Sequence, residues 1–112
     1  MIIINTTRGT VIADKAIVAK TLIKRLTGLL SRSEFNKGEA LIFHNTSSVH
    51  TIGMRFAIDV LFVNKNNVIM GVVTGMKPFR LSRLYPFCDV IELPAGTIQE
   101  SGTKKGDVIK IK

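Results

Sequence analysis

The chain has 112 residues, of which 46% are hydrophobic, and its 16 Lys and Arg against 8 Asp and Glu give a net charge of +8. This length and composition predict one domain over residues 1–112 and exclude long disordered segments. No apolar run approaches the roughly 18 residues that cross a bilayer, the run 1–4 is too short for a signal-peptide core, and Cys88 is the only cysteine. We therefore expect a cytoplasmic protein with no transmembrane segment and no internal disulfide.

The basic surplus lies at the two ends of the sequence. Residues 1–37 carry a net charge of +5, residues 38–76 of zero and residues 77–112 of +3. Such a surplus favours an acidic protein or an anionic ligand as partner, although a solvated basic surface also explains it. Nucleic acid is a less favoured partner, because the chain has one Tyr and no Trp to alternate with the basic residues.

The first elements that the sequence predicts are the two arms of a β-hairpin. Residues 2–4 and 10–13 are apolar runs, and the turn-forming residues 5–9 lie between them.

Residues 14–30 fit two interpretations. Their apolar residues fall at helical spacing, but residues 16–19 equally fit a third strand, with a short helix over residues 21–26 after it. We expect the strand followed by the short helix.

The centre of the chain contains its most hydrophobic stretch, residues 48–63, which follows an expected strand at 40–43. Strict alternation predicts β structure with one face in the core. That face carries Ile52, Met54, Phe56, Ile58, Val60 and Phe62. We divide the stretch into a core strand at 58–63 and a polar lead-in at 44–55.

The polar residues 64–67 predict a tight turn, which makes residues 68–73 the second arm of a hairpin. Residues 79–89 predict an irregular connection, and Pro94 ends a strand at 90–93. The last expected elements are a helical turn at 97–102, a turn at 104–107 and a strand at 108–111.

About eight short strands with one short N-terminal helix predict an all-β, β-rich fold. The spacing of the strands is typical of a small single-domain barrel or sandwich.

Several short motifs recur in one known family. They are Arg25-Leu-Thr-Gly28-Leu-Leu30, Glu39-Ala-Leu-Ile-Phe43, His50-Thr-Ile-Gly-Met54-Arg-Phe-Ala-Ile58-Asp59-Val-Leu-Phe62, Val68 with Pro78, Val90-Ile-Glu92-Leu-Pro94-Ala-Gly96 and Gly106-Asp107. In their order and spacing, over residues 10–110, the chain resembles the uncharacterised family known as domain of unknown function 192. The resemblance implies a compact, mostly β domain with no established activity.

The chain departs from the family pattern at two positions. Many members have Pro where this sequence has Ala57, and some have Trp where it has Gly53. Without Pro at position 57, a fixed bend between Phe56 and Ile58 is not assured.

The polar side chains of the central stretch form the candidate ligand-binding set. Its members are His44, His50, Thr51, Arg55 and Asp59. We call these five residues the polar rim. Either histidine could bind a metal with Asp59 or Cys88, but no closely spaced His or Cys pair supports a site, so we predict neither metal nor cofactor.

Asp59 lies in an apolar run, where its carboxylate must find donors. It serves the fold, by a salt bridge or by accepting from loop amides, or it serves a ligand. Arg55 is on the same strand face but about 13 Å away in extended chain. Unless the chain bends near Ala57, Arg55 pairs elsewhere, with Glu92 or Asp107 as options.

Two other residues have simpler expectations. Cys88 is expected to be a small buried side chain, because neighbouring Asp89 tends to raise the thiol pKa and weaken a nucleophile. Glu92 alternates with Ile91 and Leu93 and is expected to be exposed, with pairing to a basic residue as the alternative.

Three functions follow, none with a confident catalytic residue. The first is a non-enzymatic binding or accessory module that uses the polar rim around His50 and Asp59. The second is a small enzyme with His50 as acid/base, Asp59 orienting it and Arg55 holding an anionic substrate. The third is a weak, basic nucleic-acid binder.

Overall fold

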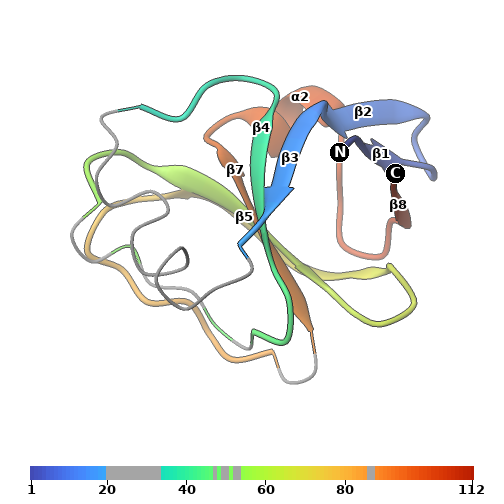
Figure 1. The fold of residues 1–112 in the computed structure, drawn as a ribbon. Helices are drawn as coiled ribbons and strands as arrows, with labels where there is room; N and C mark the ends of the chain where they lie inside the picture. The colour runs from blue at the N-terminus through green and yellow to red at the C-terminus, as the bar shows by residue number, and fades with distance from the viewer. Residues whose placement is uncertain (20–33, 47, 49–50, 52–53, 86–87) are drawn as a thin grey trace.

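A computed structural model describes residues 1–19, 34–46, 48, 51, 54–85 and 88–112. This part of the chain is mostly β, with eight strands in two sheets and one short helix, α2 (Thr97–Ser101) (Figure 1). The strands are β1 (Ile3–Asn5), β2 (Thr10–Ala13), β3 (Lys15–Val18), β4 (Glu39–Phe43), β5 (Ile58–Val63), β6 (Ile69–Met76), β7 (Asp89–Pro94) and β8 (Ile109–Ile111). The β-rich expectation is confirmed, and the helix expected at 21–26 lies outside the described residues.

No helix in the described part of the chain is both long enough and apolar enough to cross a bilayer.

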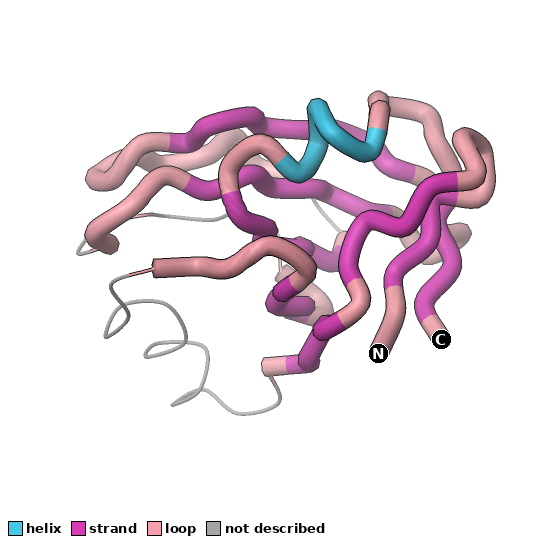
Figure 2. The backbone as a smooth tube through the Cα atoms, turned by 90° about the horizontal axis from the view of Figure 1, so that it is seen from above, coloured by secondary structure: helices cyan, strands magenta, loops and turns pink. Residues whose placement is uncertain are grey.

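The smaller sheet has the order β2-β1-β8, and the larger has the order β3-β4-β7-β5-β6. β3 and β4 are parallel, and the other neighbours are antiparallel. β1 pairs with both β2 and β8, so it joins the beginning of the sequence to its end. Backbone hydrogen bonds of 2.7 and 2.9 Å between Ile2 and Lys112 keep the termini side by side (Figures 1 and 2).

The chain passes directly from the small sheet into the large one. Asp14 separates β2 from β3, and the Gly38 carbonyl accepts from the amides of Asp14 and Lys15 at 3.1 and 2.8 Å. On the opposite edge of β3, the Ala16 amide donates to the Met1 carbonyl at 2.9 Å. The strand expected at 16–19 is thus confirmed, as β3, and it follows β2 after a bend at Asp14.

Two hydrophobic clusters lie on the two faces of the large sheet. We call the first the inter-sheet core, since it includes residues of both sheets: Ile3, Ile12, Ala13, Ala16, Ala40, Ile42, Leu61, Val63, Ile69, Ile91, Leu93, Ile98 and Ile109. We call the second the far-face cluster: Ala19, Leu41, Phe43, Met54, Ile58, Val60, Phe62, Met76, Cys88 and Val90. Because β5 contributes to both, all six of its residues are buried.

The turn expected at 64–67 is confirmed. The Asn64 side-chain oxygen accepts from the Asn66 and Val68 amides at 2.9 and 3.0 Å. Asn67 has a φ of 60°, in the left-handed region that asparagine tolerates.

The core strand expected at 58–63 is confirmed as β5, and residues 54–57 do not continue it although the alternating pattern extends through them. β5 begins at Ile58, and residues 55 and 56 form a bend. The Met54 amide donates to the Thr51 carbonyl at 3.1 Å, which closes a turn instead of a ladder. The chain therefore bends before Ile58 without proline at position 57.

Candidate functional site

Both carboxylate oxygens of Asp59 accept hydrogen bonds from backbone amides. Asp59 lies on β5 with 1% of its surface exposed. Oδ1 accepts from the Gly75 amide at 2.8 Å, and Oδ2 accepts from the amides of Gly96 and Ile98 at 3.1 and 2.9 Å. Since Gly96 precedes α2, the carboxylate holds the start of that helix against the sheet. Asp59 thus joins β5, β6 and α2.

Arg55 is exposed, and the structure gives Asp59 other partners. Asp107, one of the alternatives for Arg55, pairs with Arg8 through two bonds of 3.0 and 3.2 Å and also accepts from Asn5 at 3.0 Å. The hydrogen bond from Arg8 lowers the pKa of Asp107 to about 2, against the opposing effect of desolvation.

His44 lies at the surface beside the start of β7. Its Nδ1 is 2.9 Å from Asp89 Oδ2, and the Asn45 amide donates to the other oxygen at 3.0 Å. This pair fixes the loop after β4. His50 lies outside the described residues, and the polar rim as one five-residue site stays a prediction.

Thr51 is fully buried and holds a distant loop. Its hydroxyl donates to the Lys77 carbonyl at 2.6 Å and accepts from the Arg80 amide at 2.9 Å. Its own amide donates to the Arg80 carbonyl at 2.9 Å, and its carbonyl accepts from the Phe79 amide at 3.0 Å. These bonds fix the beginning of the segment 77–85, which we call the clamped loop.

The other end of the clamped loop is held by an aromatic stack. The Tyr85 ring packs on Phe62 with a centroid distance of 4.3 Å. Its hydroxyl occupies the space beside Gly71 that a Cβ would need. The Arg83 guanidinium lies 4.8 Å from the centroid of the same ring, in a cation–π contact.

Between these anchors the clamped loop presents apolar side chains to solvent. Phe79, Leu81 and Leu84 are 67%, 74% and 68% exposed. Phe79 also has a φ of 62°, a strained conformation for an aromatic residue, which persists because Thr51 holds the amides on either side. The sequence identified this segment only as an irregular connection, although its mixture of apolar and basic residues was visible.

The loop contains the cations Lys77, Arg80 and Arg83 and no acidic residue. In Figure 1 it runs on the side of the molecule opposite the two termini.

Glu92 is buried, and the expectation that it is exposed is wrong. Only 7% of its surface is accessible. The reason is the strand order, which places β7 between β4 and β5 in the middle of the large sheet. Desolvation by burial raises the pKa of Glu92 to about 7.

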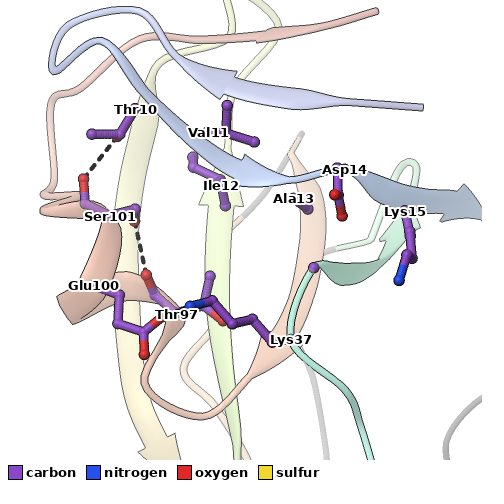
Figure 3. A pocket seen from close by; sticks show the side chains of 11 residues that line it. Thr10, Val11, Ile12, Ala13, Asp14, Lys15, Lys37, Thr97, Glu100 and Ser101 are labelled. Carbon is purple, nitrogen blue, oxygen red and sulfur yellow. Dashed lines mark hydrogen bonds and ion pairs between the residues drawn. The ribbon is translucent and has the colours of Figure 1, made fainter.

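A groove of about 560 Å³ lies between β2, α2 and residues 37–38 (Figure 3). Its polar lining includes Thr10, Asp14, Lys15, Lys37, Glu100 and Ser101. Lys37 Nζ lies 3.5 Å from Glu100 Oε2, and Thr10 Oγ1 donates to the Ser101 carbonyl at 2.8 Å. With two charges of each sign, the groove has no preference for cations or anions, and its contacts tie α2 to β2.

Cys88 is buried, as expected, and its thiol lies 3.0 and 2.9 Å from the carbonyls of Thr46 and Tyr85. Desolvation, with a further contribution from Asp89, raises the thiol pKa, which weakens it as a nucleophile. No three His, Cys, Asp or Glu side chains converge on a metal-sized space within the described ranges.

Comparison with known proteins confirms the resemblance drawn from the sequence. The family model described as Uncharacterized ACR, the domain of unknown function 192, matches residues 3–111. A UPF0127 protein of Pyrococcus furiosus is 33% identical over 111 residues, covering 93% of this chain and 92% of that protein. A UPF0127 protein of Thermococcus gammatolerans is 34% identical over 117 residues, covering 96% and 72%.

Two solved structures share the fold. A protein of unknown function from Novosphingobium aromaticivorans has a TM-score of 0.79 at 20% identity, covering 98% of this chain and 82% of that one. A proposed transcription regulator from Sinorhizobium meliloti has a TM-score of 0.79 at 22% identity, covering 97% and 89%.

Proposed function

We propose that this chain, which belongs to the Uncharacterized ACR family, is a non-enzymatic binding module that docks an acidic protein through its clamped loop. The observation that carries the proposal is a basic loop with three exposed apolar side chains, fixed in place by a buried threonine.

Fixed apolar side chains are suited to a protein partner. Burying the exposed side chains of Phe79, Leu81 and Leu84 against a partner would stabilise the complex by roughly 25 cal/mol per Å² of apolar area removed from water. Because Thr51 and Tyr85 hold the loop at both ends, little loop entropy is lost on binding.

The charge of the loop selects the kind of partner. Lys77, Arg80 and Arg83 have no acidic residue between them, so an acidic surface is attracted and a basic one repelled. Nucleic acid satisfies the charge, but of the three exposed apolar side chains only Phe79 can stack on a base, and the two leucines cannot.

In this proposal the polar rim divides by role. Thr51 supports the loop, Asp59 supports the fold, and exposed Arg55 extends the basic surface. His44 and His50 both belong to the polar lead-in, residues 44–55. We place this surface on a single cytoplasmic domain, residues 1–112, whose two sheets pack as a sandwich around the inter-sheet core.

A photo-crosslinking amino acid at position 81 tests the proposal. It should capture a partner in the source cell, and binding of that partner, once purified, should then be measured. Replacing Phe79, Leu81 and Leu84 with Ser should weaken binding about 100-fold, because three fixed apolar contacts of the interface are lost. The control is Val11→Ser with Ile17→Ser, two strand residues of similar exposure, 60% and 61%.

Charge reversal separates the partner classes. Arg80→Glu with Arg83→Glu should weaken binding of the partner at low salt, whereas Lys104→Glu with Lys105→Glu should leave that binding unchanged. Duplex DNA is included because of the description given to the S. meliloti relative. Tight DNA binding that the serine variant leaves unchanged would overturn the proposal, as would anionic vesicles bound through the same apolar residues.

A further inference from the structure

The outer edge of β2 has an unpaired backbone at Val11. Backbone bonds of 2.7 and 2.9 Å between Ile2 and Lys112 turn Ile2 toward β8, and Ile4, two residues further on, faces the same way. Ile4 is also the partner of Val11 in the ladder between β1 and β2. Opposite residues of an antiparallel ladder either exchange two bonds or both direct their amide and carbonyl away from each other. The amide and carbonyl of Val11 therefore point away from β1.

On either side of Val11 the same edge is already engaged. The Thr10 hydroxyl donates to the Ser101 carbonyl on α2 at 2.8 Å, and the Gly38 carbonyl accepts from the two amides that follow β2 at 3.1 and 2.8 Å. β2 stands at the end of its sheet, with β1 as its neighbour. Among the described residues, no backbone group bonds the outward amide and carbonyl of Val11. An unpaired donor and an unpaired acceptor thus remain between two occupied positions.

The groove of Figure 3 lies along this open edge. All four residues of β2 line it, and Thr97, Glu100 and Ser101 of α2 form the opposite wall. Its volume of about 560 Å³ is that of a ligand pocket. β2 spans about 13 Å, the length of four residues of extended chain. Because α2 closes the other side, the groove has room for one added strand and not for a further sheet.

The sequence of β2 leaves this edge unprotected. Exposed sheet edges are usually blocked by a charged residue, a proline or a covering segment. Residues 10–13 contain no charge and no proline, and Val11 is 60% exposed. The edge of β3 is treated differently, since the Met1 carbonyl accepts from the Ala16 amide at 2.9 Å and the Met1 amine donates to the Ala16 carbonyl at 3.1 Å. The chain covers one edge with its own terminus and keeps the other open.

The charges of the groove cancel. Lys37 and Glu100 pair at 3.5 Å, and Asp14 and Lys15 supply one further charge of each sign. A matching ligand therefore needs no net charge, but it needs an acceptor for the Val11 amide and a donor for the Val11 carbonyl. One residue of an extended peptide presents both groups at the required spacing.

We propose that the groove along β2 is a second binding site, and that its occupant is an uncharged, extended segment of a partner protein that adds to β2 as an antiparallel strand. One residue of this segment lies opposite Val11 and exchanges two backbone hydrogen bonds with it. The side chains beside that residue contact the exposed Val11 side chain and the wall formed by α2. The site shares no residue with the clamped loop and has no preference for acidic ligands, so the two sites are tested separately.

The probes are three peptides of five residues with blocked termini. One is Thr-Val-Thr-Val-Thr, and the others carry Glu or Lys at both ends. They are titrated by calorimetry at about 0.15 M salt, where long-range attraction is screened. The uncharged peptide should bind, and the charged peptides should match its affinity within about threefold, because the groove is neutral. N-methylation of the central threonine removes the donor to Val11 and should weaken binding by about tenfold.

A variant and an exchange measurement locate the site. Val11→Pro removes the amide that faces the groove, and proline is tolerated at an edge position whose amide does not pair within the sheet. It should weaken binding of the uncharged peptide by about tenfold, whereas Val11→Ser keeps the amide and should stay within about threefold of the wild type. Circular dichroism checks that both variants fold. In the wild type, hydrogen exchange of the Val11 amide should slow by about tenfold or more at saturating peptide.

The serine variant of the clamped loop should bind the uncharged peptide as the wild type does. Equal affinity for the N-methylated peptide, unchanged exchange of the Val11 amide or no saturable binding of any probe would overturn the proposal. So would an acidic peptide that binds far more tightly than the others and is lost in the serine variant, because the clamped loop would then be its site. A wild-type dimer that Val11→Pro dissociates would also overturn it, since a second copy of this chain would cover the edge.

Discussion

Two buried carboxylates lie on neighbouring strands of the large sheet in opposite surroundings. Asp59, on β5, accepts three backbone amides around the start of α2. Glu92, on β7, has no donor among the described residues and faces the apolar cluster. The difference shows that burial alone does not define a role for an acidic residue. Where donors are built around it, the carboxylate organises the fold; where they are missing, burial raises its pKa and its ionisation costs stability.

The largest expected effect is the loss of Asp59. Asp59→Ala leaves three amides without their acceptor and should lower the free energy of unfolding by about 4 kcal/mol, since each hydrogen bond to a charged group contributes on the order of 1.5 kcal/mol or more. Urea denaturation measures it. The control is Asp89→Ala, which removes an exposed pair and should cost less than about 1 kcal/mol. Equal losses in the two variants would mean that Asp59 does not organise α2.

Glu92 should make the protein less stable as pH rises. Its pKa is about 7 in the folded protein and 4.5 in the unfolded reference. The folded state therefore binds the proton more tightly, and stability should fall by about 3 kcal/mol from pH 4.5 through pH 7.

Glu92→Gln should remove this fall and be more stable than the wild type at pH 8, whereas Glu100→Gln should keep the wild-type profile. The measurement is denaturation at a series of pH values. A wild-type profile that Glu92→Gln leaves unaltered would contradict the unpaired state of this carboxyl.

Asp107 provides the opposite pH dependence. Its pKa is lowered from 3.8 to about 2, so its contribution is complete above pH 3.8 and is lost as pH falls through 2. Asp107→Asn should lower the free energy of unfolding by about 2 kcal/mol at pH 7, and its Tm should fall less steeply than that of the wild type as pH drops below 4. If the Tm of this variant falls as steeply as that of the wild type, another carboxylate is responsible for the acid dependence.

The smallest expected effect is at Thr51. Thr51→Val removes the hydroxyl that bonds Lys77 and Arg80 and should cost about 1 to 2 kcal/mol. Amide hydrogen exchange at residues 77, 79 and 80 should accelerate more than in the preceding strand β6. Thr6→Val, which loses one exposed bond to Val108, is the control and should change neither.

Local patterns in the sequence predict much of the fold. The hairpin turns at residues 5–9 and 64–67 follow from the turn chemistry of Asn and Gly, and the strands follow from alternation, because both signals involve near neighbours. The end of each strand is less predictable: β6 runs to Met76, beyond the arm expected at 68–73. β5 does begin at Ile58 as expected, after the Thr51 carbonyl captures the Met54 amide and turns the chain.

The environment of the candidate site depends on partners far along the chain. Alternation correctly separates Glu92 from Ile91 and Leu93, but only the strand order reveals that its face is also covered. In the same way, Thr51 reaches Lys77 across 26 residues, and nothing local to either residue indicates it. The apolar run around Asp59 signals that its carboxylate needs donors, without saying which amides supply them.

The pairing of β1 with β8 sets the order in which the protein can be completed during translation. Ile3 lies opposite Ile111, so β1 lacks its second neighbour until nearly the whole chain has been synthesised. At about 5 to 20 residues per second, a ribosome makes β1 roughly 5 to 20 s before β8. Throughout that interval the hairpin of β1 and β2 has an open edge that can pair with another nascent chain. A ribosomal pause before residue 109 prolongs that exposure, so slow codons just ahead of β8 should raise the fraction of the protein that aggregates.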